Sequence, residues 1–211
     1  MEMENLRIFD ENGKGLGTAS REEVHKKGYW HETFHCWMVS RREGQDFIHL
    51  QLRSPLKKDF PSLFDITAAG HLLADETVED GIREVEEELG LAVAFEELIP
   101  LGIIKDQIHL KDFLDNERCH TFLYRLDENP DPRFELQKEE VAGMAAVELE
   151  AFVELCLGKT AYSEAKGFEE AEDGSWRVLN ATIGLDHLVP HSRDYLEEVV
   201  SRITKELEER S

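Results

Sequence analysis

The chain has 211 residues, of which 41% are hydrophobic and 33% are charged, a composition typical of a globular protein with a sizeable core. Its 46 acidic and 24 basic residues give a net charge of −22, which would repel the phosphate backbone of a nucleic acid. These numbers argue against a nucleic-acid polymer as partner. They leave room for a small phosphate compound bridged by a metal ion.

The cysteines and the N-terminus indicate the cellular compartment. Cys36, Cys119 and Cys156 fit neither a disulfide framework nor a paired-cysteine metal site. The N-terminus is acidic and lacks an apolar segment, and no stretch approaches the ~18 apolar residues of a membrane span. We therefore predict a cytoplasmic protein in a reducing compartment, with no membrane partner.

The first third of the chain is predicted to form short strands. An Asn-Gly turn follows the first of them, and Ser20 and Glu23 have the spacing of a capping box at the start of a short helix. Aromatic and β-favouring residues on both sides of a Gly-containing turn predict a hairpin. The predicted elements are strands at residues 6–9, 33–39, 47–52 and 65–69 and a helix between Ser20 and His25.

The most regular helix is predicted between Thr77 and Gly90. Thr77 and Asp80 again have capping-box spacing, and Gly90 stands where a left-handed C-cap would lie. At about 100° per residue, four apolar side chains fall on one stripe that must face the core. These are Val78, Ile82, Val85 and Leu89.

The second half of the chain mixes strands and helices, which predicts an α+β or mixed α/β fold. Residues 159–173 are polar and acidic, and we expect a loop or helix outside the main core. The final helix has an amphipathic stripe that packs on its own domain or, as an alternative, on a second copy in a homodimer. The predicted elements are strands at residues 98–104, 120–126 and 145–147 and helices at 149–157 and 195–209.

Three glutamates share the polar side of the helix before Gly90. Glu84, Glu87 and Glu88 are spaced i, i+3 and i+4, so their like charges are crowded together. A divalent cation with oxygen ligands would turn this repulsion into binding free energy. A solvated acidic face is the alternative that spacing alone leaves open.

The segment from Gly70 to Leu91 resembles the signature of the Nudix hydrolases: Gly, five residues, Glu, seven residues, then Arg-Glu-apolar-x-Glu-Glu-x-Gly-apolar. The second half matches at every specified position from Arg83 onward. The first half is one residue short, because six residues separate Glu76 from Arg83. Counting back from Arg83 places Asp75 at the first acidic position, so either Asp75 or Glu76 fills it.

The resemblance implies an α/β/α sandwich with a mixed sheet over residues 1–157. Residues 158–211 are then a C-terminal extension with an amphipathic helix packed on the same domain. It further implies hydrolysis of a nucleoside diphosphate or another small organic diphosphate by attack of water at phosphorus, with Mg²⁺ or Mn²⁺ as cofactor. A non-catalytic nucleotide-binding protein of the same fold is an alternative.

The resemblance also implies roles for single residues. Glu84, Glu87 and Glu88 are expected to bind the metal, with Glu87 and Glu88 in the catalytic group. Arg83 would orient these carboxylates, and the substrate would contact Gly70 and His71. Two further acids, Glu117 and Glu140, are candidates for the base, and the sequence does not choose between them.

A second set of residues resembles the Nudix branch that contains isopentenyl-diphosphate isomerase. Early histidines, a histidine after residue 70 and two acids correspond to a divalent-metal site in those isomerases; neutral imidazoles and carboxylates suit Mn²⁺ or Zn²⁺. The matching residues are His25, His31, His71, Asp115 and Glu117. Hydrogen bonding within the sheet is the alternative role of the histidines.

One position separates this chain from the isomerases. Where the resemblance places a cysteine that takes part in proton transfer, the chain has Ala69. A methyl group cannot exchange a proton, whereas metal-assisted hydrolysis needs no such cysteine. Isomerisation by that mechanism should therefore be absent or very slow unless another residue substitutes, and an isomerase-like enzyme is the alternative to the hydrolase.

Overall fold

The computed structural model describes residues 4–111, 113–126, 133–171 and 173–209. Strands and helices are mixed along the chain, as predicted. In chain order they are β1 (Asn5–Phe9), β2 (Gly15–Ser20), α1 (Arg21–Lys27), β3 (Trp30–Arg42), β4 (Gln45–Arg53), β5 (Phe64–Asp65), β6 (Ala68–His71), α2 (Arg83–Leu89), β7 (Ile99–Leu110), β8 (Phe113–Arg125), β9 (Val141–Glu148), α3 (Leu149–Cys156), β10 (Ser163–Glu170), β11 (Trp176–Ile183) and α4 (Arg193–Glu209). Short 3-10 helices lie at Glu79–Ile82, Phe95–Glu97 and Leu185–His187.

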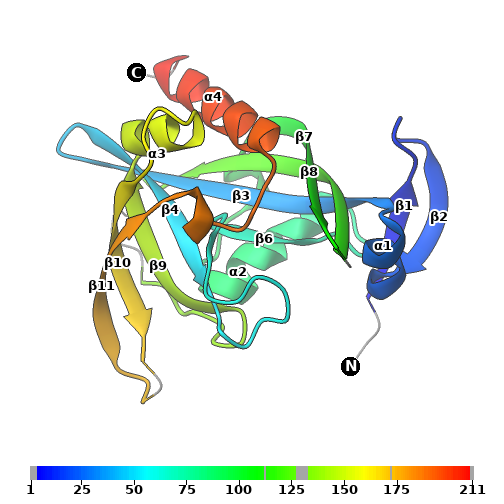
Figure 1. Ribbon diagram of the computed structural model, residues 1–211, viewed down its shortest axis with the longest axis horizontal. Coiled ribbons are helices and arrows are strands. Elements are labelled where there is room, and N and C mark those ends of the chain that lie inside the picture. The colour runs from blue at the N-terminus through cyan, green and yellow to red at the C-terminus, as the bar shows by residue number, and fades with distance from the viewer. Residues whose placement is uncertain (1–3, 112, 127–132, 172, 210–211) are drawn as a thin grey trace.

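The strands of the described ranges join one sheet, with the long strand β3 running through it (Figure 1). β3 pairs in parallel with β8 and antiparallel with β1, β4 and β6. Beyond β4, the sheet continues through β9 and β10 to β11. The sheet is therefore mixed, as predicted.

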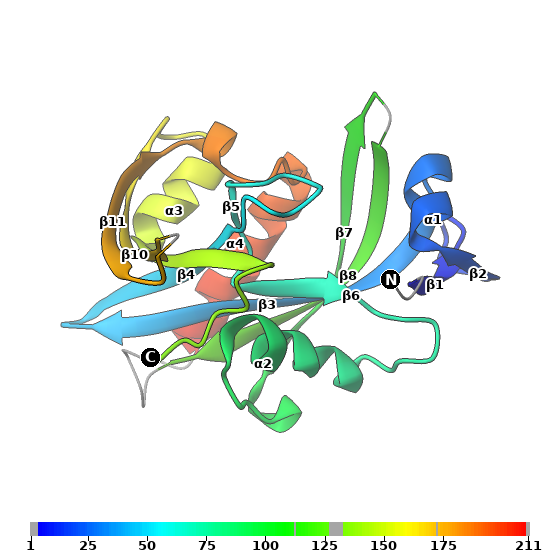
Figure 2. The same cartoon turned by 90° about the horizontal axis from the view of Figure 1, so that it is seen from below.

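Helices cover both faces of this sheet (Figure 2). α3 and α4 pack on one face, where Tyr195 of α4 joins Trp37 in a buried cluster. α2 packs on the other face, where Leu89 joins Phe34. Trp37 and Phe34 both belong to β3. They lie on opposite faces of the sheet because the side chains of a strand alternate between its two faces. None of the helices in the described ranges is both long and apolar enough to span a membrane.

The helix before Gly90 begins later than predicted. Thr77 and Asp80 do hydrogen-bond to each other, but Glu79–Ile82 forms a 3-10 turn and the α-helix starts at Arg83. Gly90 has φ 68° and forms the predicted left-handed C-cap. The predicted stripe is confirmed, since its four residues are buried or partly buried in one cluster: Val78, Ile82, Val85 and Leu89.

The prediction for residues 159–173 is wrong. They contain β10, which pairs with β9 and with β11, itself an unpredicted strand. Ser163 and Ala165 are buried, while the charged Glu164 and Lys166 are exposed, so the segment alternates with the period of a strand. The amphipathic C-terminal helix is confirmed as α4, whose apolar side packs on the sheet.

Candidate active site

The acidic side of α2 is organised around Arg83. Its Nε donates to Oε1 of Glu76 at 2.6 Å, and its Nη1 lies 2.6 Å from Oε1 of Glu84 and 3.1 Å from Oε2 of Glu87. Its Nη2 donates to the backbone carbonyl of His71 at 3.2 Å. A single guanidinium thus fixes carboxylates from the helix and from the loop before it.

Glu76, and not Asp75, occupies the acidic position beside Arg83. Oε2 of Glu76 also accepts a hydrogen bond from the backbone N–H of Leu73 at 2.8 Å. Burial raises the pKa of Glu76, but the hydrogen bonds from Arg83 and Leu73 outweigh it and lower the pKa below its ordinary value. Asp75 is exposed. The shortened loop therefore still delivers a carboxylate to Arg83.

Two of the three predicted metal-binding glutamates are withdrawn from solvent. Glu88 is only 4% exposed, and its Oε2 accepts hydrogen bonds from the Ala69 N–H at 3.3 Å and the Gln51 amide at 3.2 Å. Burial raises the pKa of Glu84 to about 7, and burial together with Glu84 raises that of Glu88 to about 8. Glu87 is exposed. A divalent cation would stabilise the ionised forms of such crowded carboxylates.

Gly70 leaves the space that the Glu84 carboxylate occupies. A Cβ atom on Gly70 would lie 2.1 Å from Oε1 and 2.2 Å from Cδ of Glu84. We expect Gly70→Ala to displace this carboxylate and to weaken Mn²⁺ binding about tenfold or more, measured by titration calorimetry. Gly15→Ala is the matched control, because nothing lies within 4 Å of its added Cβ. Equal affinities of Gly70→Ala and the parent would contradict the role of Gly70.

The second predicted cluster forms where α1, β3, β6 and β8 meet. β3 lies between β6 and β8, so that Thr33 is in register with His71 and His31 with Glu117. His25 comes from the end of α1, and its ring centroid lies 5.3 Å from that of His31 and 5.4 Å from that of His71. The structure therefore brings together all five predicted residues: His25, His31, His71, Asp115 and Glu117.

Several polar atoms of this cluster are buried without a hydrogen bond among the described residues. They are Nε2 of His25, Nε2 of His31 and Oδ1 of Asp115, with the oxygen 3.4 Å from each nitrogen. Nδ1 of His31 donates to the Tyr29 carbonyl at 3.2 Å, which leaves a lone pair on Nε2. Burial lowers the pKa of His31 to about 4, so the ring is neutral. This donor set fits Mn²⁺ or Zn²⁺.

Both clusters face one cavity of about 780 Å³. Ten Asp or Glu residues and five Lys or Arg residues line it, so the cavity is acidic. Such a wall would repel a diphosphate unless cations bound beside it. Predicted site residues in its lining are His25, Gly70, His71, Arg83, Glu84, Glu87, Glu88, Asp115, Glu117 and Glu140.

The two candidate bases line this cavity in different surroundings. Glu117, on β8, is largely buried, with its Oε1 4.0 Å from Nε2 of His31. Glu140, just before β9, is half-buried and forms an ion pair with Lys57. Lys57 also opposes the rise that burial causes in the pKa of Glu88. Glu140 therefore belongs to the α2 side of the cavity and Glu117 to the histidine side.

The cavity wall also contains His191, which the sequence analysis did not identify. Its Nε2 lies 2.9 Å from Oδ1 of Asp65 and its Nδ1 2.7 Å from Oδ2 of Asp106. Burial lowers the pKa of His191, but the two aspartates outweigh it and raise the pKa to about 10. His191 is therefore a buried cation at neutral pH. Asp65 has a second partner, Arg53, at 2.6 Å.

Known proteins are similar to this chain in sequence and in fold. The NUDIX domain model matches residues 29–167. An uncharacterized Nudix hydrolase of Clostridium acetobutylicum is 40% identical over 95% of this chain and 97% of its own length. An isopentenyl-diphosphate Delta-isomerase of Aliivibrio fischeri is 30% identical over 66% of this chain and 77% of its own length.

A solved structure shows the same architecture. The MutT protein of Methanosarcina mazei superposes with a TM-score of 0.51 at 18% identity, over 83% of this chain and 96% of that one. The segment matched by the domain model contains α2 and the strands from β3 to β9, which carry most of both clusters. The chain therefore belongs to the Nudix family, in a branch that resembles the isopentenyl-diphosphate isomerases.

Proposed function

We propose that the chain is a metal-dependent hydrolase that cleaves the diphosphate linkage of a nucleoside diphosphate or another small organic diphosphate. One observation carries this proposal. Arg83 holds Glu84 and Glu87 beside the buried Glu88, and all of these acids face the cavity that the histidine cluster also faces. The similarity to Nudix hydrolases supports the same reaction class.

The acidic cavity supports a cation requirement as part of this proposal. Mg²⁺ or Mn²⁺ bound there would neutralise phosphate charge and lower the pKa of a water molecule. Glu84, Glu87 and Glu88 would hold an ion on the α2 side, and the histidine cluster would hold a second. The protein's own part is to keep these ligands in place. Arg83 does this for Glu84 and Glu87, and the Ala69 N–H and the Gln51 amide do it for Glu88.

The proposed reaction is a displacement at phosphorus. The oxygen of a water molecule forms a new bond to phosphorus, and the bridging P–O bond breaks with its electron pair on the leaving oxygen. A carboxylate accepts the proton of the water. Glu117 and Glu140 both line the cavity, and each has the chemistry to take this proton.

Turnover in ¹⁸O-labelled water tests the proposal. The chain is incubated with a panel of nucleoside and organic diphosphates, and products are analysed by mass spectrometry. We expect one ¹⁸O atom in a phosphate-containing product, loss of turnover with EDTA, and recovery with Mg²⁺ or Mn²⁺. Metal-dependent nucleotide binding without any product would instead support the non-catalytic alternative.

The histidine cluster and the similarity to isomerases favour one second candidate, an isopentenyl-diphosphate isomerase. Ala69 argues against it, because its methyl group cannot exchange a proton. Cys119 lies 3.5 Å from Oε2 of Glu117, but it is fully buried, and burial raises its pKa well above the ordinary value. We expect no deuterium in recovered isopentenyl diphosphate or its isomer after incubation in D₂O. Incorporated label would establish the isomerase instead.

A further inference from the structure

The two carboxylate oxygens of Glu117 have different neighbours. Oε2 lies 3.3 Å from Nε2 of His35 and 3.5 Å from both Oγ1 of Thr33 and Sγ of Cys119. Oε1 lies on the side of the histidine cluster, 4.0 Å from Nε2 of His31. The chain's own donors thus hold one oxygen and leave the other facing the cluster.

The hydrogen-bond donor on His35 is set by Tyr195 of α4. Nδ1 of His35 lies 2.7 Å from the Tyr195 hydroxyl, and Nε1 of Trp37 donates to the same hydroxyl at 3.2 Å. The indole N–H of Trp37 can only donate, and among the described residues the buried Tyr195 hydroxyl has no further hydrogen-bond partner. The hydroxyl proton is therefore satisfied only if it is donated to Nδ1 of His35. With Nδ1 accepting this proton, the ring carries its own N–H on Nε2, which lies 3.3 Å from Oε2 of Glu117.

Contacts just before the first turn of α4 fix the position of Tyr195. His191, four residues before Tyr195, is clamped between Asp65 and Asp106, and the Ser192 N–H donates to Oδ1 of Asp106 at 2.8 Å. The ring centroids of His191 and Tyr195 are 5.2 Å apart. The buried ion pairs therefore anchor the residue that contacts His35.

We propose that Tyr195 is a positioning residue for the metal site: through His35 it holds the Glu117 carboxylate with Oε1 toward the histidine cluster. The inference rests on the proposed function, whose metal site it concerns. Tyr195 lies beyond residues 29–167, the segment that the NUDIX domain model matches. The C-terminal helix is then part of the active site as well as a cover for the sheet.

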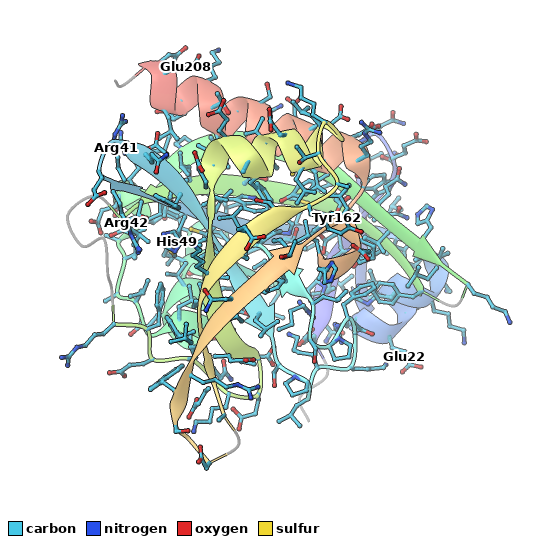
Figure 3. The ribbon with its side chains drawn as sticks, turned by 60° about the vertical axis from the view of Figure 1, so that its left-hand side comes forward. Glu22, Arg41, Arg42, His49, Tyr162 and Glu208 are labelled. Carbon is cyan, nitrogen blue, oxygen red and sulfur yellow. The ribbon has the colours of Figure 1, made fainter. Side chains whose placement is uncertain are left out.

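The inference is tested by measuring the binding of Mn²⁺ alone to the full chain with titration calorimetry. The relevant site is the one that His31→Gln removes. We expect Tyr195→Phe to bind Mn²⁺ at that site about 10- to 100-fold more weakly than the parent. Tyr162→Phe is the matched control, since Tyr162 belongs to the same C-terminal part of the chain and is 62% exposed. Its side chain is labelled in Figure 3. The affinity of Tyr162→Phe should equal that of the parent.

A rescue variant separates positioning from packing. Adding His35→Gln to Tyr195→Phe should restore most of the Mn²⁺ affinity, because a glutamine amide carries its own N–H donor and needs no partner to fix its proton. A general loss of packing would not be reversed by a second substitution. Circular dichroism checks the fold, and if Tyr195→Phe does not fold, His35→Leu must show the same loss of affinity.

The outcomes distinguish the inference from the function on which it rests. A folded Tyr195→Phe that binds Mn²⁺ like the parent, while His31→Gln does not, overturns the inference alone. Weakened binding that His35→Gln fails to restore also overturns it. A parent chain with no His31-dependent Mn²⁺ site removes the histidine site from the proposed function, and the inference fails with it.

Discussion

Replacing Glu88 with glutamine should lower kcat for the proposed diphosphate hydrolysis at least about 100-fold, because the charge that would hold the cation is lost. Glutamine keeps the size of Glu88, and its side-chain oxygen can still accept from the Ala69 N–H. The substitution therefore removes charge with little change in shape. Steady-state kinetics with saturating Mg²⁺ measure the effect.

Glu86→Gln on the same helix is the matched control. Glu86 is exposed, and we expect its variant to retain kcat within about twofold. Without metal, Glu88→Gln should be at least as stable to heat as the parent. Burial raises the pKa of Glu88, so its ionised form destabilises the folded chain, and the amide avoids that cost. Parental kcat in Glu88→Gln would contradict the proposed site.

His191→Gln should lower the free energy of unfolding by about 3–5 kcal/mol at pH 7, because it leaves two buried aspartates without their shared cation. The contacts concerned are those of His191 with Asp65 and Asp106, at 2.9 and 2.7 Å. Urea unfolding, monitored by circular dichroism, measures the change in the free energy of unfolding. His187→Gln is the control, since His187 pairs with Asp186 at the surface and its loss should cost less than about 1 kcal/mol.

The same histidine predicts the sign of a pH dependence. Its pKa is 6.5 in an ordinary environment and about 10 in the fold, so the folded chain retains a proton that the unfolded chain loses. Its stabilisation is therefore complete below about pH 6.5 and is lost as the pH rises through 10. In between, the stability difference between the parent and His191→Gln should shrink by about 1.4 kcal/mol per pH unit. A difference that stays constant from pH 7 to 10 would show that His191 is not a buried cation.

The parts of the molecule that local sequence determines were predicted well. The apolar stripe of α2, its glycine cap and its acidic side all depend on spacings within about four residues, which fix relative positions on a helix. The histidine cluster depends on pairing between distant strands. Its residues were predicted from the resemblance to the isomerases, and their proximity became visible only through the register of β3 with β6 and β8.

The C-terminal part shows where local signals end. β10 consists mostly of Glu and small residues, which individually do not favour strands. It forms a strand because it fits closely on β9: a Cβ on Gly167 would lie 1.9 Å from the Met144 carbonyl oxygen. His191 and Tyr195 reach the site through contacts with residues 85 to 160 positions earlier. Spacing in the sequence carries no information about such contacts.

β3 serves two purposes with its two faces. His31 and His35 alternate with Phe34 and Cys36, which are buried under α2. If β3 slipped by one residue against its neighbouring strands, these two sets would exchange faces. The imidazoles would then lie in the apolar layer under α2, and the apolar side chains would lie among the carboxylates. Such a misaligned chain could neither collapse tightly nor capture an ion. If the histidine cluster binds a divalent ion, ions added during refolding should therefore favour the correct alignment, because they bind only the correctly aligned chain.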